Sequence, residues 1–323
     1  MEAGAASFDA AAALRERVLE EVHKAVVGQD QVVESLLVGL LSGGHVLLEG
    51  VPGVAKTLMV RALARALDAS FHRIQFTPDL MPADILGTRV FDLASRTFNL
   101  TRGPIFADVI LADEINRAPP KTQAALLEAM QERQVTLDGE RHALPPLFTV
   151  FATQNPIESE GTYPLPEAQL DRFLFKVVVG YPSPEEEDRI LARAAAGFEA
   201  ADLESTGMAP VVHIDEVLAL RRQLRQVLVS DPVRDYVRRL VAATREAPEL
   251  RLGAGPRAAV HLLLCARTLA ALRGRAFVTP DDIRFLVHPV LAHRVLLDAD
   301  AEIDGVEPTD VLDRLLEEVE VPR

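Results

Sequence analysis

The chain contains a single cysteine, Cys265, and no tryptophan among its 323 residues. One cysteine cannot form an internal disulfide, and its apolar helical surroundings, "AAVHLLLCARTLAALRG", predict a small buried residue rather than a reactive thiol. No apolar run reaches the roughly 20 residues that a membrane-spanning helix needs. The first residues also lack the basic start and apolar core of a signal peptide. We therefore expect a cytoplasmic protein with no transmembrane segment.

Basic residues are in deficit, because 34 Lys and Arg stand against 48 Asp and Glu and give a formal net charge of −14. A general electrostatic grip on nucleic acid phosphates needs a basic surface, so no nucleic acid partner is expected. The histidines show no metal-ligand spacing, and His72, His142 and His213 are interpreted as ordinary surface or core residues. The absence of a G-x-S-x-G motif leaves Ser/His catalysis without support.

Hydrophobic residues make up 49% of the chain, which is typical of a globular protein with a real core. At about 150 residues per domain, the length predicts two domains. In the first part, short apolar runs alternate with helical patterns, which favours an α/β fold with a parallel sheet covered by helices on both faces. Two further segments predict β-hairpins, 88–103 and 133–145, and the second carries an Asp138-Gly139 turn. The expected sheet strands lie in residues 43–50, 70–76, 108–113, 147–153 and 173–180.

After about residue 182 the pattern becomes helical, beginning with a good helix start at Ser183 and Glu186. We therefore expect an α/β domain over residues 1–182 and a linker with an all-α domain over residues 183–323. The stretch 194–210 is the expected flexible link. The expected helices of this second part lie in residues 214–228, 232–245, 256–273, 280–287 and 309–319.

The stretch "GVPGVAKT", which begins at Gly50, lies between a predicted strand and a predicted helix. It follows the phosphate-binding pattern G-x-x-x-x-G-K-[ST], except that Ala55 replaces the second glycine. Gly50 and Gly53 would let the backbone turn and approach a triphosphate. Lys56 would reach the β and γ phosphates, and Thr57 would place its hydroxyl on Mg²⁺. A plain strand-to-helix turn is a serious alternative on this motif alone.

Ala55 places a physical condition on a nucleotide site. A β-carbon disfavours the left-handed region of backbone conformation, so we expect a negative φ at Ala55 and a methyl group directed away from the phosphates. A positive φ would count against a competent site.

The strand in "VILADEIN" ends in two adjacent carboxylates, Asp113 and Glu114. Such a pair at a buried strand end is costly unless a cation is close. Mg²⁺ would satisfy Asp113, and Glu114 could polarise the water that attacks ATP. Asn155 in "FATQNP" could orient water or contact the γ-phosphate, although a turn residue before Pro156 is common. The loop and the acidic pair, in this order and each on its own strand, favour a nucleotide site over chance.

Two arginines each allow a functional and an ordinary interpretation. Arg172 precedes a predicted strand, where a surface ion pair with Asp171 is the simple alternative. Arg257 follows Pro256 at a predicted helix start, where the helix dipole disfavours a cation unless an anion is near. A γ-phosphate would be such an anion, and an arginine that bends into solvent is the alternative.

Four segments together resemble the MoxR-type AAA+ ATPases: "LLEGVPGVAKT", "IFADVILADEINRAPPKTQAALLEAMQERQVTLDG", "FATQNPIESEGTYPLPEAQLDRF" and "GPRAAVHLLLCARTLAALRGRAFVTPDDI". The block "DEINRAPPKTQAALLEAMQE" is far more specific than the loop, and MoxR-type sequences often carry alanine before the lysine, as Ala55 does here. The resemblance covers nearly the whole chain. It implies a P-loop AAA+ core with β-hairpin insertions and an all-α lid, in the clade shared with magnesium chelatase and replicative helicases.

The resemblance also implies a role for each matching residue. Lys56 and Thr57 would be the Walker A residues, and Asp113 and Glu114 would be the Walker B pair. Thr57 and Asp113 would hold Mg²⁺, with ATP as the nucleotide. The implied nucleotide-contacting residues are Val27, Gly28 and Gln29 near the adenine, and Gly50, Val51, Pro52, Gly53, Val54, Ala55, Lys56, Thr57 and Leu58 in the loop.

The remaining implied roles depend on assembly. Asn155 would be sensor 1, Arg257 would be sensor 2, and Arg172 would be an arginine finger that reaches the ATP of the neighbouring subunit. Such proteins form rings, usually hexamers, and act as chaperone-like motors on protein clients. A partner with a von Willebrand factor A domain, on a separate chain, is also implied.

Two alternatives to a client-remodelling motor stay open at this point. A nucleic-acid-dependent motor is suggested by the helicase relatives of the clade, but the second hairpin holds Asp138 and Glu140 beside Arg141, and the chain is acidic. A non-hydrolysing ATP-binding switch is the other alternative, against which Glu114 and Arg172 argue.

Overall fold

The computed structural model describes residues 8–92, 96–156, 161–200 and 202–322. Outside the described residues lie 93–95 of the first expected hairpin, 157–160 of the third family-like segment and residue 201 of the expected link.

The chain forms two compact units. The sheet unit comprises Arg17–Phe173 and Val177–Leu218. The helical unit comprises the residues up to Glu16, Leu174–Lys176 and Ala219–Arg323. The sheet unit therefore includes residues beyond 182, as far as Leu218.

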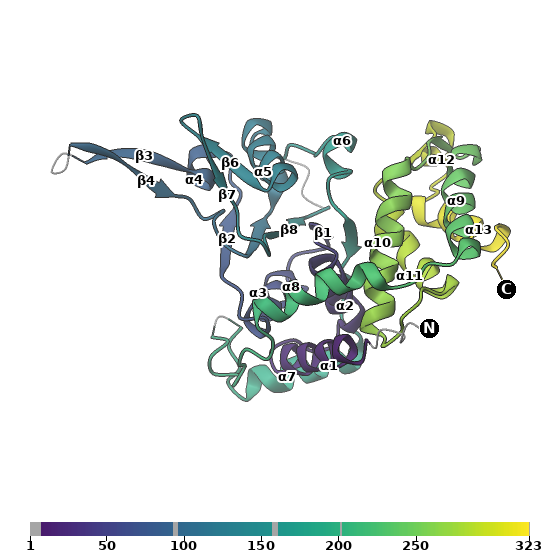
Figure 1. The fold of residues 1–323 in the computed structure, drawn as a ribbon, viewed down its shortest axis with the longest axis horizontal. Helices are drawn as coiled ribbons and strands as arrows, with labels where there is room; N and C mark the ends of the chain where they lie inside the picture. The colour runs from purple at the N-terminus through teal and green to yellow at the C-terminus, as the bar shows by residue number, and fades with distance from the viewer. Residues whose placement is uncertain (1–7, 93–95, 157–160, 201, 323) are drawn as a thin grey trace, which may run out of the picture. The chain divides into compact units, whose positions relative to one another are not determined.

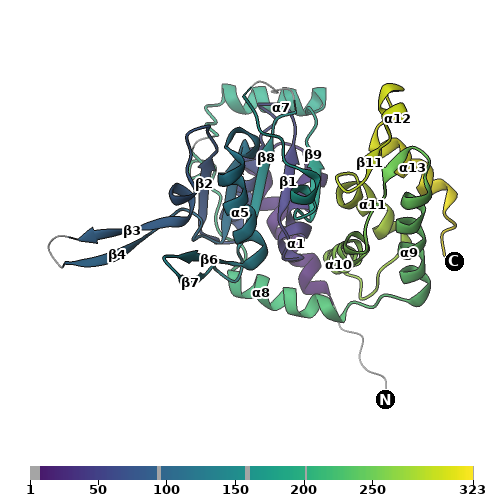
Figure 2. The same cartoon turned by 90° about the horizontal axis from the view of Figure 1, so that it is seen from above.

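The sheet unit is built on a sheet with the strand order β2-β5-β8-β1-β9 (Figure 1 and Figure 2). The pairs β1–β8, β5–β8 and β2–β5 are parallel, as the sequence predicted. Consecutive side chains of a strand point to opposite faces, so the near-complete burial of β5 and β8 requires both faces to be covered. The strands are β1 (Val46–Glu49), β2 (Phe71–Gln75), β5 (Val109–Asp113), β8 (Thr149–Gln154) and β9 (Phe175–Val178).

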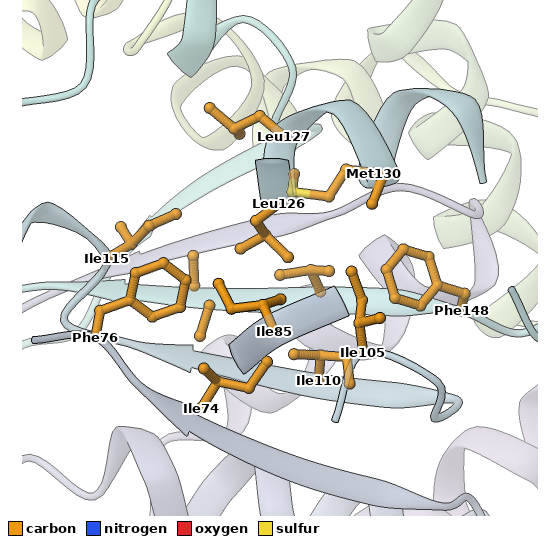
Figure 3. Packing of buried hydrophobic residues seen from close by; sticks show 14 of the residues in the cluster. Ile74, Phe76, Ile85, Ile105, Ile110, Ile115, Leu126, Leu127, Met130 and Phe148 are labelled. Carbon is orange, nitrogen blue, oxygen red and sulfur yellow. The ribbon is translucent and has the colours of Figure 1, made fainter. Parts of the chain in front are cut away.

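A hydrophobic core lies between the sheet and α5 (Pro120–Glu132). Leu126 and Met130, one turn apart on α5, project toward Ile110 of β5 and toward Phe148, which precedes β8 (Figure 3). All four side chains are buried. This packing buries the face of the sheet that α5 covers.

The other helices of the sheet unit include α7, whose start was predicted from the sequence. α7 begins as predicted, because the Ser183 hydroxyl accepts from the Glu186 amide at 3.3 Å and the Glu186 carboxylate accepts from the Ser183 amide at 2.8 Å. The helices are α1 (Asp9–His23, shared with the helical unit), α2 (Asp30–Leu41), α3 (Lys56–Ala66), α4 (Pro82–Leu86), η1 (Ile115–Arg117), α6 (Glu167–Leu170) and α7 (Pro184–Ala195).

Both expected hairpins are present, as β3 (Gly87–Asp92) with β4 (Thr97–Arg102), and β6 (Gln134–Leu137) with β7 (Glu140–Ala143). The first hairpin extends away from the sheet (Figure 1). The second turns at Asp138 and Gly139, whose φ angles of 48° and 83° suit a two-residue hairpin turn. An ion pair of 2.5 Å between Arg89 and Glu140 joins the two hairpins.

The helical unit contains α9 (Asp231–Glu246), α10 (Pro256–Leu272), α11 (Pro280–Leu291), α12 (Ala299–Ile303) and α13 (Pro308–Glu318). α8 (Ile214–Gln223) and η2 (Leu224–Gln226) lead into it, and a small unexpected sheet pairs β10 (Leu250–Leu252) with β11 (Leu296–Leu297).

Two local features of the helical unit bear on the sequence predictions. α11 continues past the expected end at residue 287 and includes Pro289, because a proline in the last turn removes only one hydrogen bond near the helix end. Cys265 is buried in α10, as predicted. Within the described ranges, no helix combines the length and apolar character needed to cross a membrane.

Candidate nucleotide-binding site

A cavity of about 600 Å³ in the sheet unit lies where β1, β5 and β8 end. The carboxyl ends of parallel strands meet at one edge of a sheet, so three predicted groups come together there. They are the loop after β1, the Asp113-Glu114 pair after β5 and Asn155 after β8. From the loop and the start of α3, the cavity is lined by Pro52, Gly53, Ala55, Lys56, Thr57 and Leu58.

Ala55 has φ 61° and ψ 22°, so the predicted negative φ is wrong. Ala55 is the N-cap of α3, and the next residue, Lys56, is helical. A left-handed residue beside a right-handed one turns neighbouring backbone N–H groups toward one point and forms an anion-binding concavity. The left-handed conformation costs a residue with a β-carbon roughly 1–2 kcal/mol. The expectation that a positive φ would count against the site left out this geometry, in which a left-handed residue helps to form the concavity.

Two glycines of the loop allow this turn. Gly53 has φ 89°, a conformation open mainly to glycine. At Gly50, a β-carbon would lie 2.6 Å from the carbonyl oxygen of Val179, so the close approach of the chain after β9 requires glycine there. Gly50, Val51 and Val54 do not line the cavity.

Lys56 is folded toward its own loop. Its ammonium donates to the carbonyl oxygens of Gly50 and Val51, the latter at 3.3 Å. Burial lowers the pKa of Lys56, and the charges of Asp113, Glu114 and Glu49 partly offset this effect. A phosphate in the cavity would provide Lys56 with an anionic partner.

The Thr57 hydroxyl and the Asp113 carboxylate come together across α3 and β5, with Oγ1 and Oδ2 3.5 Å apart. Both are hard oxygen donors, the donor type that Mg²⁺ takes, so this pair fits the expected metal. Across the described part of the chain, no group of three or more His, Cys, Asp or Glu side chains is placed to hold a metal ion. Mg²⁺ commonly uses one or two protein ligands and completes its shell with water and phosphate oxygens.

Thr153 on β8 was not predicted, and it contacts both acidic residues, at the side chain of Asp113 and at the backbone of Glu114. Its hydroxyl donates to Asp113 Oδ1 at 2.5 Å and accepts from the backbone N–H of Glu114 at 2.8 Å. Glu114 adopts φ 57°, and its side chain accepts from Gln75 at 2.7 Å and pairs with Arg117 at 3.1 Å. The carboxylate geometry is thus set by side chains on two neighbouring strands.

The three residues expected near an adenine differ in position. Val27 lines the cavity, together with Ala25 and Val26. Gly28 and Gln29 do not, and the Gln29 side-chain amide donates to the Gly180 carbonyl oxygen at 3.2 Å. The loop between α1 and α2 therefore lies at the cavity, with Val27 as its contributing member from the expected group.

Further lining comes from α7, whose start was predicted at Ser183, and from the segment after it, which was predicted to be a flexible link. Ile190, Arg193, Phe198 and Ala200 line the cavity there. Arg193 donates to the carbonyl oxygens of His23 and Lys24 at 2.9 and 3.2 Å, which fixes α7 to the end of α1. No motif in this stretch signals a binding role.

One further lining residue could have been found from the sequence. Arg61 lies one helical turn after Thr57 on α3, so helical periodicity alone puts both on one face. Arg61 therefore lines the same cavity as the loop.

The two arginines lie outside this cavity's lining. Arg172 follows α6 and lines a separate space of about 210 Å³ in the sheet unit, together with Glu128, Gln131 and Gln169. Arg257 is the second residue of α10 in the helical unit, as its helix-start signal predicted. Within the sheet unit, the structure therefore brings together the loop, the acidic pair and Asn155 at one cavity and places Arg172 at another.

Comparison with known proteins gives matches along both units. A family described as "ATPase family associated with various cellular activities (AAA)" matches residues 45–175, and the AAA lid domain matches residues 242–315. The chain is 49% identical over 318 residues to Chaperone MoxR1 of Mycobacterium tuberculosis, covering 95% of this chain and 82% of that protein.

Two further similarities have comparable extent. Protein MoxR of Methylorubrum extorquens is 33% identical over 301 residues, with 87% of each protein covered. A crystal structure of a protein from Cytophaga hutchinsonii matches with a TM-score of 0.88 and 40% identity over 98% of each chain.

Proposed function

Because the chain belongs to the MoxR-type AAA+ ATPases, we propose that it hydrolyses ATP with Mg²⁺ and couples hydrolysis to chaperone-like remodelling of protein clients. The observation that carries the proposal is the convergence of three strand ends on one cavity. That convergence places a phosphate-binding loop, two carboxylates and an amide within one space of about 600 Å³.

The loop would bind the triphosphate. Backbone N–H groups around Ala55 and the first turn of α3 are donors with no helical partner, and the helix start adds a partial positive charge. Lys56 would exchange its loop carbonyl partners for the β and γ phosphates. Thr57 and Asp113 would hold Mg²⁺, which when bound neutralises charge on the phosphates.

Glu114 would orient and deprotonate the attacking water, and Asn155 would contact the γ-phosphate or that water. The Glu114 backbone N–H donates to the Thr153 hydroxyl, and this bond supports the assignment because it holds the backbone from which the Glu114 side chain extends. The adenine would lie against the apolar lining residues Val27, Ile190 and Phe198, which suit a purine ring.

We further propose a ring, with six subunits as the expected number. Arg172 lies outside this chain's own cavity, which supports an arginine finger directed at the ATP of a neighbouring subunit. Arg257 would act as a second phosphate sensor from the lid. Residues 1–182 would form the core and residues 183–323 the linker and lid. A separate chain with a von Willebrand factor A domain would help select the client.

Two substitutions test the proposal on the purified protein. Lys56→Ala should abolish ATP binding, because the loop loses its cation. Glu114→Gln should retain ATP binding while turnover falls by about 10²-fold or more, as removal of a general base does. The controls are Lys121→Ala and Glu132→Gln, which make the same two substitutions at exposed positions of α5. Both should leave ATP binding and turnover intact.

The two readouts are ATP affinity by fluorescence titration and phosphate release. Normal turnover in Glu114→Gln would refute the role of that carboxylate. To identify the client, the same variant held in ATP is used as bait, with Lys56→Ala as the comparison bait. Proteins retained by Glu114→Gln and absent from the Lys56→Ala sample are clients or partners. Equal recovery by both baits would contradict ATP-dependent client binding.

A further inference from the structure

Arg73 on β2 occupies the carboxylate that is assigned to the metal. Its Nε and Nη2 both donate to Asp113 Oδ2, at 2.9 and 2.7 Å. The register of the sheet produces this contact, because Gln75 lies opposite Asp113 and Arg73, two residues earlier, points to the same face. The Thr57 hydroxyl approaches the same oxygen at 3.5 Å. Arg73 and a metal held by Thr57 and Asp113 would therefore use one oxygen atom.

We propose that Arg73 is a displaceable cation that competes with Mg²⁺ for Asp113 and so sets the Mg²⁺ concentration that the site requires. The proposal rests on the proposed function in one respect, the assignment of Asp113 as a metal ligand. It assigns to Arg73 the role of competing with the metal, which is distinct from the roles proposed for the loop and the acidic pair.

The burial of the two partners supports displacement. The Asp113 side chain is 11% exposed, whereas the Arg73 side chain is 50% exposed. A buried carboxylate without a cation is costly, so Asp113 keeps one partner at all times. Arg73 can return to water at small cost because half of its surface is already solvated. One cation can thus replace the other without leaving the carboxylate unpaired.

The hydrogen bonds around Asp113 indicate which of its oxygens exchanges partners and where Arg73 goes when it leaves. Its second oxygen, Oδ1, accepts the Thr153 hydroxyl at 2.5 Å, so Oδ2 is the oxygen open to exchange. Arg73 Nη2 also donates to Gln75 Oε1 at 2.5 Å, and this bond gives the guanidinium an anchor beside the site after it leaves Asp113. Gln75 in turn donates to Glu114 at 2.7 Å, so two hydrogen bonds through Gln75 link Arg73 to the proposed general base.

The test uses Arg73→Gln, which removes the competing charge, and Arg117→Gln, which removes an equal charge paired with the neighbouring carboxylate of Glu114. The first readout is the thermal midpoint in MgCl2 alone, without nucleotide. Wild type and Arg117→Gln should respond weakly, and Arg73→Gln should be stabilised in a Mg²⁺-dependent manner. The second readout is the Mg²⁺ concentration that half-saturates the Mg²⁺-dependent part of ATP binding. It should fall at least about fivefold in Arg73→Gln, the lower end of usual coupling between two ligands.

Arg73→Lys provides the rescue variant, because it keeps the charge and should return the half-saturating Mg²⁺ concentration toward the wild-type value. If Arg73→Gln folds poorly, Arg73→Lys still tests the proposal. Its retained charge should leave the Mg²⁺ requirement close to that of wild type. The proposal is overturned if Arg73→Gln leaves the Mg²⁺ requirement unchanged or raises it. It is equally overturned if Arg117→Gln lowers that requirement as much, because the effect would then be general electrostatics.

Failure of the proposed function gives a different result. If ATP binding by wild type is independent of Mg²⁺, and Asp113→Asn does not alter that behaviour, the metal assignment itself is wrong. If wild type depends on Mg²⁺ and loses that dependence in Asp113→Asn, the metal site stands and only the competition by Arg73 is under test.

Discussion

Replacing Ala55 by glycine should stabilise the sheet unit while leaving the nucleotide loop functional. Ala55 has φ 61° and ψ 22°, and a β-carbon in this region costs roughly 1–2 kcal/mol that glycine does not incur. Glycine is also preferred over alanine at a helix N-cap. Glycine also gives the unfolded chain more conformational freedom, which lowers the stability of the fold by about 0.4–1 kcal/mol. The net expectation is a stabilisation of about 1 kcal/mol.

The matched control is Ala192→Gly, at an exposed interior position of α7 with ordinary helical backbone. There the same change should destabilise by about 1 kcal/mol, because no left-handed conformation is relieved. For a unit of this size, 1 kcal/mol moves the melting temperature by about 2–4 °C. Calorimetry should therefore show a rise for Ala55→Gly and a fall for Ala192→Gly, with ATP affinity retained in both. A fall for Ala55→Gly similar to that of the control would refute the argument that Ala55 is strained.

Three further predictions concern the site and its assembly. Arg172→Ala and Glu114→Gln should each be inactive alone, and mixing them should restore part of the phosphate release. In mixed assemblies, Arg172 of a Glu114→Gln chain can act on the site of an Arg172→Ala chain that keeps Glu114. A mixture without activity would contradict action in trans. Gly50→Ala should lower stability by about 1–3 kcal/mol, since its β-carbon would lie 2.6 Å from the Val179 carbonyl oxygen, and a melting temperature equal to wild type would show that the chain after β9 can move aside. Phe198→Ala should weaken ATP binding by about 1 kcal/mol or more while inhibition by inorganic triphosphate is unchanged, and equal weakening of both ligands would exclude a contact with the base.

Much of the fold could be predicted from sequence because the informative patterns are local. Alternating strands and helices predicted the parallel sheet, and each expected strand overlaps a strand of the structure. Asp138-Gly139 predicted its hairpin, since few residues tolerate the positive φ angles of that turn. The predicted end of the helix that begins at Pro280 was wrong, because the sequence placed it at residue 287 and the helix continues through Pro289 to Leu291.

The sequence by itself determined the elements of the phosphate site and their order. A loop between a strand and a helix, and polar residues at the ends of the next strands, must meet at one edge once the strands are parallel. Lys56, Thr57, Asp113, Glu114 and Asn155 all line one cavity for that reason. None of this requires contacts beyond chain order and strand direction.

Tertiary structure decided the features that depend on contacts between distant segments. The sign of φ at Ala55 follows from how the loop must turn between β1 and α3, which no residue preference at that position reveals. Phe198 reaches the cavity only because Arg193 fixes α7 against the end of α1, which lies far earlier in the chain. Arg73 meets Asp113 only through the register of β2 on β5. Local preference determines which elements form, whereas packing and strand register determine which side chains share a site.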